Sequence, residues 1–303
     1  MKKVDLSVII LSYNTKDLLR NCLQSVFSSK LNSSKVEAIV VDNASSDGSA
    51  RMVEREFPQV NLIQSKKNLG FAGGNNLGFK KSKGRYILFL NSDTEVVREA
   101  FVKMITFFDK NPKIGALSPK TMLFSGGIDP DCHRGFPTPW ASLCYFFGLE
   151  RLFPKSRFLG QYHKFYLNLD KTHEIDAGFG TFMFVRREAL EEVGNWDESY
   201  FFYGEDLDLF YRIKKAGWKV MFYPEVLLYH HKGASSGLRK ESKSVTQADR
   251  RTRIRTAKAS ISAMEIFYKK FYKDKYPSWL TFIVLLGIKL KGFFRILSQI
   301  VRP

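Results

Sequence analysis

The sequence predicts an α/β fold in which a mostly parallel sheet is flanked by helices and followed by a basic helical extension. Short apolar runs rich in branched and aromatic residues alternate with stretches that repeat apolar residues every three to four positions. Short links between them favour parallel strands joined by right-handed crossovers. Strands are expected at residues 6–12, 36–41, 60–64 and 85–90, and helices at residues 16–28, 49–57, 75–81 and 101–108.

The second half of the catalytic-looking region continues the sheet less regularly. A Gly- and Pro-rich irregular segment (125–139) precedes an aromatic and basic one (140–158), which we interpret either as a lid over a second substrate or as part of the core. Further strands are expected at residues 114–118, 175–185, 220–223 and 226–230, and helices at residues 186–193 and 206–215.

Charge divides the chain into two regions. Of a formal net charge of +18, the segment 232–303 carries +13, with 17 Lys and Arg against 4 Asp and Glu. A basic tail indicates an anionic partner, either a nucleic acid or a membrane surface. We therefore expect a catalytic domain at residues 1–235 and a basic helical tail at residues 236–303.

The location of the protein is predicted from what the sequence lacks. No apolar run reaches the roughly 20 residues that cross a bilayer, and the N-terminus has no signal-peptide layout. The cysteines, Cys22, Cys132 and Cys144, show no metal-binding spacing. We expect reduced, buried thiols in a cytoplasmic protein.

The apolar run 85–90 breaks off into Asn91-Ser92-Asp93-Thr94, four small side chains that favour turns. Ligands bind beyond the carboxyl ends of strands in open α/β sheets. A carboxylate there suits a hard divalent cation that carries a diphosphate. Capping of the helix that follows is an equally good interpretation of Asp93.

Three other stretches are candidates for ligand binding. Three glycines within residues 68–76 allow close backbone approach and offer N–H donors to phosphate, although a plain flexible connection is the alternative. The acidic group Glu205, Asp206 and Asp208 either favours a helix N-terminus or holds a carboxylate whose pKa desolvation disturbs. His230 is either structural or a metal or phosphate ligand at a strand end.

These motifs occur in an order that resembles the family 2 inverting glycosyltransferases, and most of all their bacterial rhamnosyltransferase branch, which builds cell-surface polysaccharide. The resemblance covers about the first 235 residues. It rests on Ser12-Tyr13-Asn14, the run from Val41 to Ser49, Asn68-Leu69-Gly70-Phe71-Ala72, Leu90-Asn91-Ser92-Asp93-Thr94 and Gly204-Glu205-Asp206-Leu207-Asp208-Leu209.

The resemblance implies a GT-A fold and a nucleotide-diphosphate sugar donor, with dTDP-rhamnose favoured, held through Mg²⁺ or Mn²⁺. It implies that Asp206 is the catalytic base and that Asp93, with His230, binds the metal. Asn91 stands where many relatives have Asp. The donor-binding residues that it implies are Tyr13, Asn14, Asp42, Asn68, Gly70, Asn75 and Asn91.

The chemistry of such a transfer fits these residue types. A leaving diphosphate needs charge neutralisation, and the attacking hydroxyl needs a base. A single displacement inverts the anomeric configuration. The expected acceptor is polyprenyl-linked or a polysaccharide, so residues 276–301, apolar and basic, are expected on the inner membrane surface. Packing of this segment on the catalytic domain or on a second subunit is the alternative.

The competing function is a non-catalytic nucleotide-sugar or nucleic-acid binding protein that uses the same fold and a basic tail. The tail contains neither a helix-turn-helix nor an RNP signature. We therefore expect no nucleic-acid partner and a metal-dependent glycosyltransferase.

Overall fold

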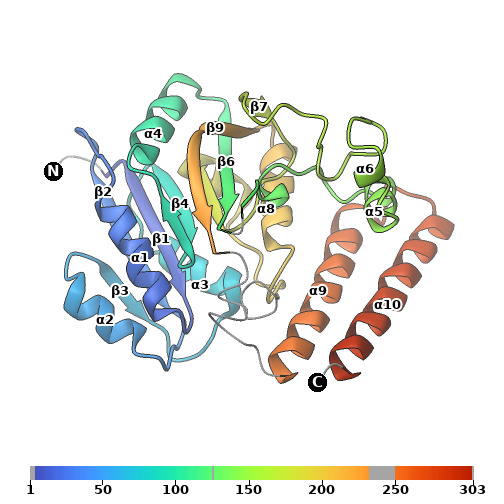
Figure 1. Cartoon of the computed structure of the whole chain (residues 1–303), viewed down its shortest axis with the longest axis horizontal. Helices are drawn as coiled ribbons and strands as arrows, with labels where there is room; N and C mark the ends of the chain where they lie inside the picture. The colour runs from blue at the N-terminus through green and yellow to red at the C-terminus, as the bar shows by residue number, and fades with distance from the viewer. Residues whose placement is uncertain (1–3, 125, 232–249, 302–303) are drawn as a thin grey trace.

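The computed structural model describes residues 4–124, 126–231 and 250–301, and within them it contains one nine-stranded sheet covered by helices (Figure 1). The strands follow the order β3-β2-β1-β4-β8-β6-β9-β5, and β7 pairs with β9. Their bounds are β1 (Leu6–Ser12), β2 (Val36–Asp42), β3 (Asn61–Gln64), β4 (Tyr86–Asn91), β5 (Thr94–Val96), β6 (Ile114–Leu123), β7 (His173–Glu174), β8 (Phe182–Arg186) and β9 (Lys219–His230).

Most strands of the sheet run in one direction. β1 is parallel to β2 and β4, β2 is parallel to β3, and β6 is parallel to β9. Since β8 is antiparallel to both β4 and β6, those two strands share one direction. The carboxyl ends of β1, β2, β4 and β9 therefore lie at the same edge, which confirms the predicted architecture.

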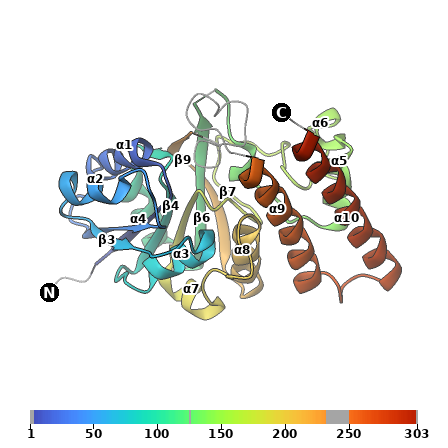
Figure 2. The ribbon, with the colours of Figure 1, turned by 90° about the horizontal axis from the view of Figure 1, so that it is seen from below.

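Helices cover both faces of the sheet. Figures 1 and 2 place α1, α2 and α4 on one face and α3, α7 and α8 on the other. The bounds are α1 (Lys16–Phe27), α2 (Ser49–Glu56), α3 (Gly70–Phe79), α4 (Ala100–Lys110), α5 (Pro139–Phe146), α6 (Leu149–Leu152), α7 (Arg187–Val193), α8 (Glu205–Lys215), α9 (Arg250–Phe271) and α10 (Ser278–Val301), with a 3₁₀ turn η1 at Pro130–Cys132.

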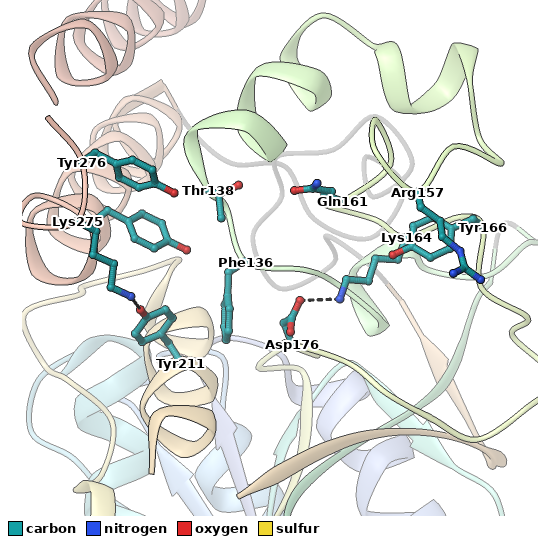
Figure 3. Close-up of a pocket in the computed structure, with 11 residues that line it drawn as sticks. Phe136, Thr138, Arg157, Gln161, Lys164, Tyr166, Asp176, Tyr211, Lys275 and Tyr276 are labelled. Atoms are coloured by element: carbon teal, nitrogen blue, oxygen red, sulfur yellow. Dashed lines mark hydrogen bonds and ion pairs between the residues drawn. The ribbon is translucent and has the colours of Figure 1, made fainter. Parts of the chain in front are cut away.

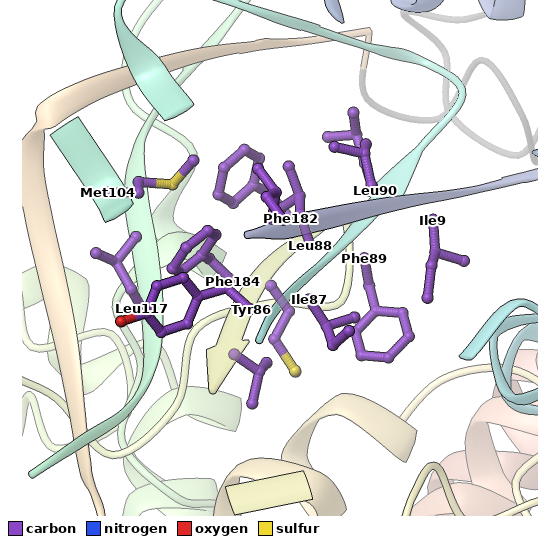
Figure 4. Close-up of a cluster of buried hydrophobic side chains, with 14 of the residues drawn as sticks. Ile9, Tyr86, Ile87, Leu88, Phe89, Leu90, Met104, Leu117, Phe182 and Phe184 are labelled. Atoms are coloured by element: carbon purple, nitrogen blue, oxygen red, sulfur yellow. The ribbon is translucent and has the colours of Figure 1, made fainter. Parts of the chain in front are cut away.

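The central strand β4 is buried on both of its faces. All five residues from Tyr86 to Leu90 are at most 1% exposed, and side chains from β1, β8 and α4 surround them (Figure 4). Burial on both faces explains why this segment is a continuous apolar run without alternation. Each such side chain contributes about 1.5–3 kcal/mol through the hydrophobic effect.

Helix α3 begins at Gly70, so the prediction that residues 68–74 form a loop before a helix at residues 75–81 is wrong. The glycines serve packing. An added Cβ at Gly74 would lie 2.3 Å from Leu11, and one at Gly78 would lie 2.5 Å from Ile9. Because β1 carries both of those side chains, the glycines let α3 approach the sheet closely.

Two of the expected strands differ in extent. The strand predicted at residues 175–185 is confined to β8, because the chain turns at Gly180 and Thr181, where Phe179 forms an isolated bridge with Phe182. The two strands predicted at residues 220–223 and 226–230 form the single strand β9. The residues between the two predicted strands are accommodated by a register shift in the β6–β9 pairing, between Pro119 and Lys120 of β6.

The helical extension packs on the catalytic region through α9. Side chains of α9, among them Phe267 and Tyr268, share a buried cluster with Tyr200 and Tyr211 near and on α8. Lys270 also bonds Asp208 at 2.6 Å. The α9–α10 pair lies beside the domain (Figure 2). The predicted boundary at residue 235 lies outside the described residues.

Helix α10 packs on α9 with one side and leaves large apolar side chains exposed on the other. Gly292 is buried against Ile261, whereas the exposed positions are Trp279, Phe282, Ile283, Leu286, Leu290, Phe293, Phe294, Leu297 and Ile300. Among the described residues, no helix combines the length and the apolar character that crossing a membrane requires.

The contact between α3 and β1 can be tested with Gly78→Ala. The new methyl overlaps Ile9, a cost of about 1–3 kcal/mol, partly offset by up to about 1 kcal/mol from the better helix propensity of Ala. We expect the free energy of unfolding in urea to fall by about 1–2 kcal/mol. Gly287→Ala in α10, where nothing lies within 4 Å of the new Cβ, is the control. Equal stability of the two variants would contradict this packing role.

Candidate active site

A cavity of about 1220 Å³ opens at the edge where the parallel strands end. Its lining includes the segments that follow β1, β2 and β4, the last residue of β9 and the start of α8. Seven of the ten predicted site residues line it, because strand ends and a helix N-terminus converge there: Tyr13, Asn68, Gly70, Asn91, Asp93, Asp206 and His230.

Asp93 and His230 form a deeply buried polar pair in the cavity. Asp93 is 1% exposed, and its Oδ1 lies 3.7 Å from Nε2 of His230. The pairing of β5 with β9 sets Thr94 opposite His230 and so brings the two side chains together. Behind them, Oδ2 of the fully buried Asp129 lies 3.4 Å from Nδ1 of His230. A carboxylate at the second ring nitrogen is how proteins orient metal-binding imidazoles.

Asp206 lies at the first turn of α8, where three donors hold its carboxylate. Oδ2 accepts from Nη2 of Arg134 at 2.7 Å and from the backbone N–H of Gly180 at 3.1 Å. Oδ1 accepts from the backbone N–H of Leu207. Arg134 is itself buried and donates from Nε to the carbonyl of Gly178. The side chain of Asp206 is thus fixed in orientation while 15% of it stays exposed.

Glu205 precedes Asp206 and is the more buried of the two carboxyl groups. Its Oε2 has no hydrogen-bond partner among the described residues. Desolvation, and then the charge of Asp206, raises the pKa of Glu205 to about 8. The raised pKa favours the neutral form of Glu205, which agrees in direction with the predicted effect of desolvation on a carboxyl group of this cluster.

A network of amides joins the ends of β2 and α3 on the other side of the cavity. Asn43 donates from Nδ2 to Oδ1 of Asn68 and to the carbonyl of Gly70, and its Oδ1 accepts from the backbone N–H of Leu69. Gly70 has φ +74°, and a Cβ there would lie 2.8 Å from the carbonyl of Phe201. Glycine is required at this position by conformation and by close approach to the chain before α8.

Three of the predicted donor-binding residues do not line the cavity. Asn14 accepts from the backbone N–H of Ser46 and so ties two strand-end loops together. Asp42 is 4% exposed and accepts from the backbone N–H of Ser45. Asn75 is buried within α3 and donates to the carbonyl of Phe71. The roles predicted for these residues at the donor remain predictions.

A second, smaller cavity of about 520 Å³ is lined in part by Phe136. Its carboxylate, Asp176, is paired with Lys164 at 2.6 Å and with Lys214 at 3.2 Å, and Lys275 points at Tyr211 (Figure 3). Among the described residues, its lining includes no carboxylate from the ends of the parallel strands. We therefore place the candidate active site in the larger cavity.

Sequence reasoning missed Asp129, Arg134 and Asn43 as members of the site. The first two lie in or beside the irregular Gly- and Pro-rich segment around η1, which has no periodicity to place its side chains. The signal that could have identified them was the occurrence of charged residues, Asp129 and Arg134, in a loop that directly follows a strand. Asn43 belongs to the motif from Val41 to Ser49, but only its neighbour Asp42 was predicted to bind the donor.

Comparison with known proteins identifies the catalytic region. The sequence profile of glycosyl transferase family 2 matches residues 7–194. The N-acetylglucosaminyl-diphospho-decaprenol L-rhamnosyltransferase of Mycobacterium tuberculosis is 26% identical over 260 residues, which cover 77% of this chain and 78% of the relative. The low-salt glycan biosynthesis hexosyltransferase of Haloferax volcanii is 28% identical over 215 residues, 70% of this chain and 62% of the relative.

A solved structure shares the fold over the length of the chain. The mannosyltransferase of Pyrobaculum calidifontis, in complex with GDP-Man and Mn²⁺, aligns with a TM-score of 0.59 over 99% of this chain and 74% of its own. The sequence identity is 18%, so the likeness concerns the fold. It supports the GT-A architecture predicted from the sequence.

The environment of Glu205 predicts a pH dependence of stability. Between about pH 4.5 and pH 8 the unfolded chain loses the proton of Glu205 while the folded chain retains it, so the unfolding free energy falls as the pH rises. Glu205→Gln removes this penalty. Its stability relative to the wild type should rise from pH 4.5 to pH 8 by on the order of a few kcal/mol.

Urea unfolding at several pH values measures this difference. Glu191→Gln, at an exposed position of α7, is the matched control and should show a difference that does not depend on pH. A pH-independent difference for Glu205→Gln as well would contradict burial of a protonated carboxyl group.

Proposed function

We propose that this chain, which belongs to glycosyl transferase family 2, moves a sugar with inversion from a nucleotide-diphosphate donor to a hydroxyl group of a glycan or glycolipid. The observation that carries the proposal is the convergence of Asp93, His230 and Asp206 in one cavity at the carboxyl ends of the strands. In this proposal Asp93 and His230 hold the diphosphate through a cation, and Asp206 accepts the proton.

Asp93 and His230 fit a divalent cation. A carboxylate oxygen and an imidazole nitrogen converge to 3.7 Å, and both are donors that Mn²⁺ accepts. The described residues contain no group of three His, Cys, Asp or Glu placed to hold a metal. The remaining positions would go to diphosphate oxygens and water, which is common where a metal binds with a nucleotide. A bound Mg²⁺ or Mn²⁺ would neutralise charge on the leaving diphosphate.

Asp206 would act as the general base. The acceptor O–H gives its proton to Asp206 while the oxygen forms a bond with the anomeric carbon, and the bond from that carbon to the diphosphate oxygen breaks. The ion pair with Arg134 and the bond from Gly180 position the carboxylate before the substrate arrives. Correct positioning of a base contributes about 10²–10⁴-fold to such a step.

The donor we favour is dTDP-rhamnose. The support is the similarity to the mycobacterial L-rhamnosyltransferase, together with the rhamnosyltransferase-like order of the sequence motifs. A panel of sugar nucleotides assayed for transfer and hydrolysis tests it. Preference for a uridine or guanosine donor would overturn the choice of sugar nucleotide and leave the reaction type standing.

Separate substitutions distinguish the two chemical tasks. Asp206→Asn should lower transfer by about 10²–10⁴-fold and leave donor binding within about twofold, because the base acts only in the chemical step. Asp93→Ala should instead weaken Mn²⁺-dependent binding of thymidine diphosphate about tenfold or more, measured by calorimetry. Asp170→Asn, at a side chain 80% exposed, is the control for both. Equal loss of binding in both variants would refute this division of roles.

We also propose that α10 holds the enzyme at the cytoplasmic membrane surface. Phe282 is 68% exposed, Phe293 is 62% exposed, and Lys289 lies among these apolar positions. Phe147 and Phe153, beside the α5–α6 pair, are 73% and 54% exposed, so they are not core residues. An apolar helix face with cations beside it is typical of interfacial binding to anionic lipids.

Replacing apolar side chains on α10 tests membrane binding. The double variant Phe282→Ser, Phe293→Ser should reduce sedimentation with phosphatidylglycerol liposomes at least tenfold, because each buried phenyl ring contributes about 1.5–3 kcal/mol. Phe124→Ser, at an exposed ring remote from α10 in the sequence, should have no effect. If the double variant sediments like the wild type, α10 is not the anchor.

A further inference from the structure

The active-site cavity extends beyond Asp206 to the helical extension. Its far part is lined mostly by apolar side chains and small residues from three helices, α5, α9 and α10. A single hollow therefore connects the strand-end carboxylates with α9 and with α10, the helix that leaves an apolar face exposed. The lining residues of this far part include Leu143, Phe146, Ala263, Met264, Ile283 and Ile288.

Three cations lie in the same part of the cavity. Lys291 and Arg295 are one turn apart on α10, and Arg255 belongs to α9. In the described part of the chain, none of the three forms an ion pair with a carboxylate. Nζ of Lys291 lies 3.5 Å from the ring centroid of Phe146, and the guanidinium of Arg255 lies 4.1 Å from that of Phe201.

The surroundings of Lys291 favour an anion. Burial, and then the charge of Arg295, lowers the pKa of Lys291 to about 8. Two cations next to each other on one helix repel, and a partly desolvated ammonium without a carboxylate is costly. A ligand that brings two negative charges would relieve both effects, whereas a neutral apolar chain would relieve neither.

We propose that Arg255, Lys291 and Arg295 bind the diphosphate of an isoprenoid-linked sugar acceptor, and that the apolar walls of α5, α9 and α10 hold the first units of its chain. The sugar of that acceptor then extends along the cavity toward Asp206. The inference rests on the proposed glycosyl transfer and specifies its acceptor site.

Two features favour this occupant over an ordinary phospholipid. The apolar walls and the cations belong to the cavity that contains Asp206, so a sugar carried by a ligand held there can extend toward that carboxylate, which a phospholipid without a sugar cannot do. The helix that carries Lys291 and Arg295, α10, also has the exposed apolar face, so the rest of a long isoprenoid chain could remain in the membrane. An isoprenoid diphosphate carrying a sugar meets all of these requirements.

Binding of farnesyl diphosphate to the full-length protein tests the proposal without any need for transfer. By calorimetry, the wild type should bind farnesyl diphosphate at least tenfold more tightly than farnesol or inorganic diphosphate. Lys291→Met should weaken binding about tenfold, because a charge-assisted contact is lost. Lys289→Met removes the same charge from an exposed position of the same helix, outside the cavity lining, and should change nothing.

Gly287 offers an independent test of the chain-binding part. It lines the cavity, and a Cβ there would have nothing within 4 Å. Gly287→Leu should therefore fold, as measured by circular dichroism, and weaken farnesyl diphosphate binding at least fivefold by occupying the space of the chain. Gly287→Ala adds too little volume to block it and is the control. Binding of inorganic diphosphate should be unchanged in both variants.

Several outcomes would overturn the proposal. They are no binding of farnesyl diphosphate, equal affinity for farnesol, equal losses in Lys291→Met and Lys289→Met, or displacement of farnesyl diphosphate by equimolar dioctanoyl phosphatidylglycerol. Failure of the glycosyl transfer itself would appear differently, as absence of donor binding and turnover in the sugar-nucleotide panel. The two failures are therefore distinguishable.

Discussion

The buried ion pair between Arg134 and Asp206 is the interaction on which the geometry of the site depends. It joins the irregular segment after η1 to the first turn of α8, and the bond from Arg134 to the carbonyl of Gly178 adds the segment before β8. Removing one partner of a buried pair leaves a desolvated charge and costs about 3–5 kcal/mol. The pair thus holds three sequence-distant segments in one arrangement and fixes the carboxylate that faces the cavity.

Charge is arranged in the cavity as acidic and basic regions. The strand-end part contains Asp93, Glu205 and Asp206, and the α9–α10 part contains Arg255 and Lys291. Burial raises the pKa of Glu205 and so favours its neutral form, which limits the negative charge near Asp206. In the proposed function, this arrangement gives a cation-bound donor diphosphate and an acceptor diphosphate separate positions, so that two anionic substrates approach without direct repulsion.

The helical extension contributes to the active site as well as to the surface. Helix α9 shares a buried aromatic cluster with α8 and is anchored by Lys270 to Asp208. That packing sets α10 against the open side of the cavity. The two interpretations given for residues 276–301, membrane binding and packing on the catalytic domain or on a second subunit, concern α10 and remain predictions. The exposed apolar face of α10 fits the membrane interpretation.

The sequence by itself determined the elements that depend on local pattern. Apolar runs, helical periodicity and small polar residues after strands were sufficient for β1, β2, β4 and α8, and for singling out Asp93 and Asp206, which line one cavity. These elements can be predicted from sequence because hydrophobic periodicity and turn preferences depend on only a few neighbouring residues. The family motifs added the reaction type.

The tertiary structure decided what depends on residues far apart in the chain. Gly74 was predicted to lie in a loop and Gly78 in a helix, and neither prediction revealed their packing role. That role, close approach to Leu11 and Ile9, is set by a strand more than 60 positions earlier. Arg134 and Asp129 could not be assigned because their partners, Asp206 and His230, are 72 and 101 positions away. Local sequence encodes backbone preference, whereas a site is a set of contacts that exist only once the sheet has brought its strand ends together.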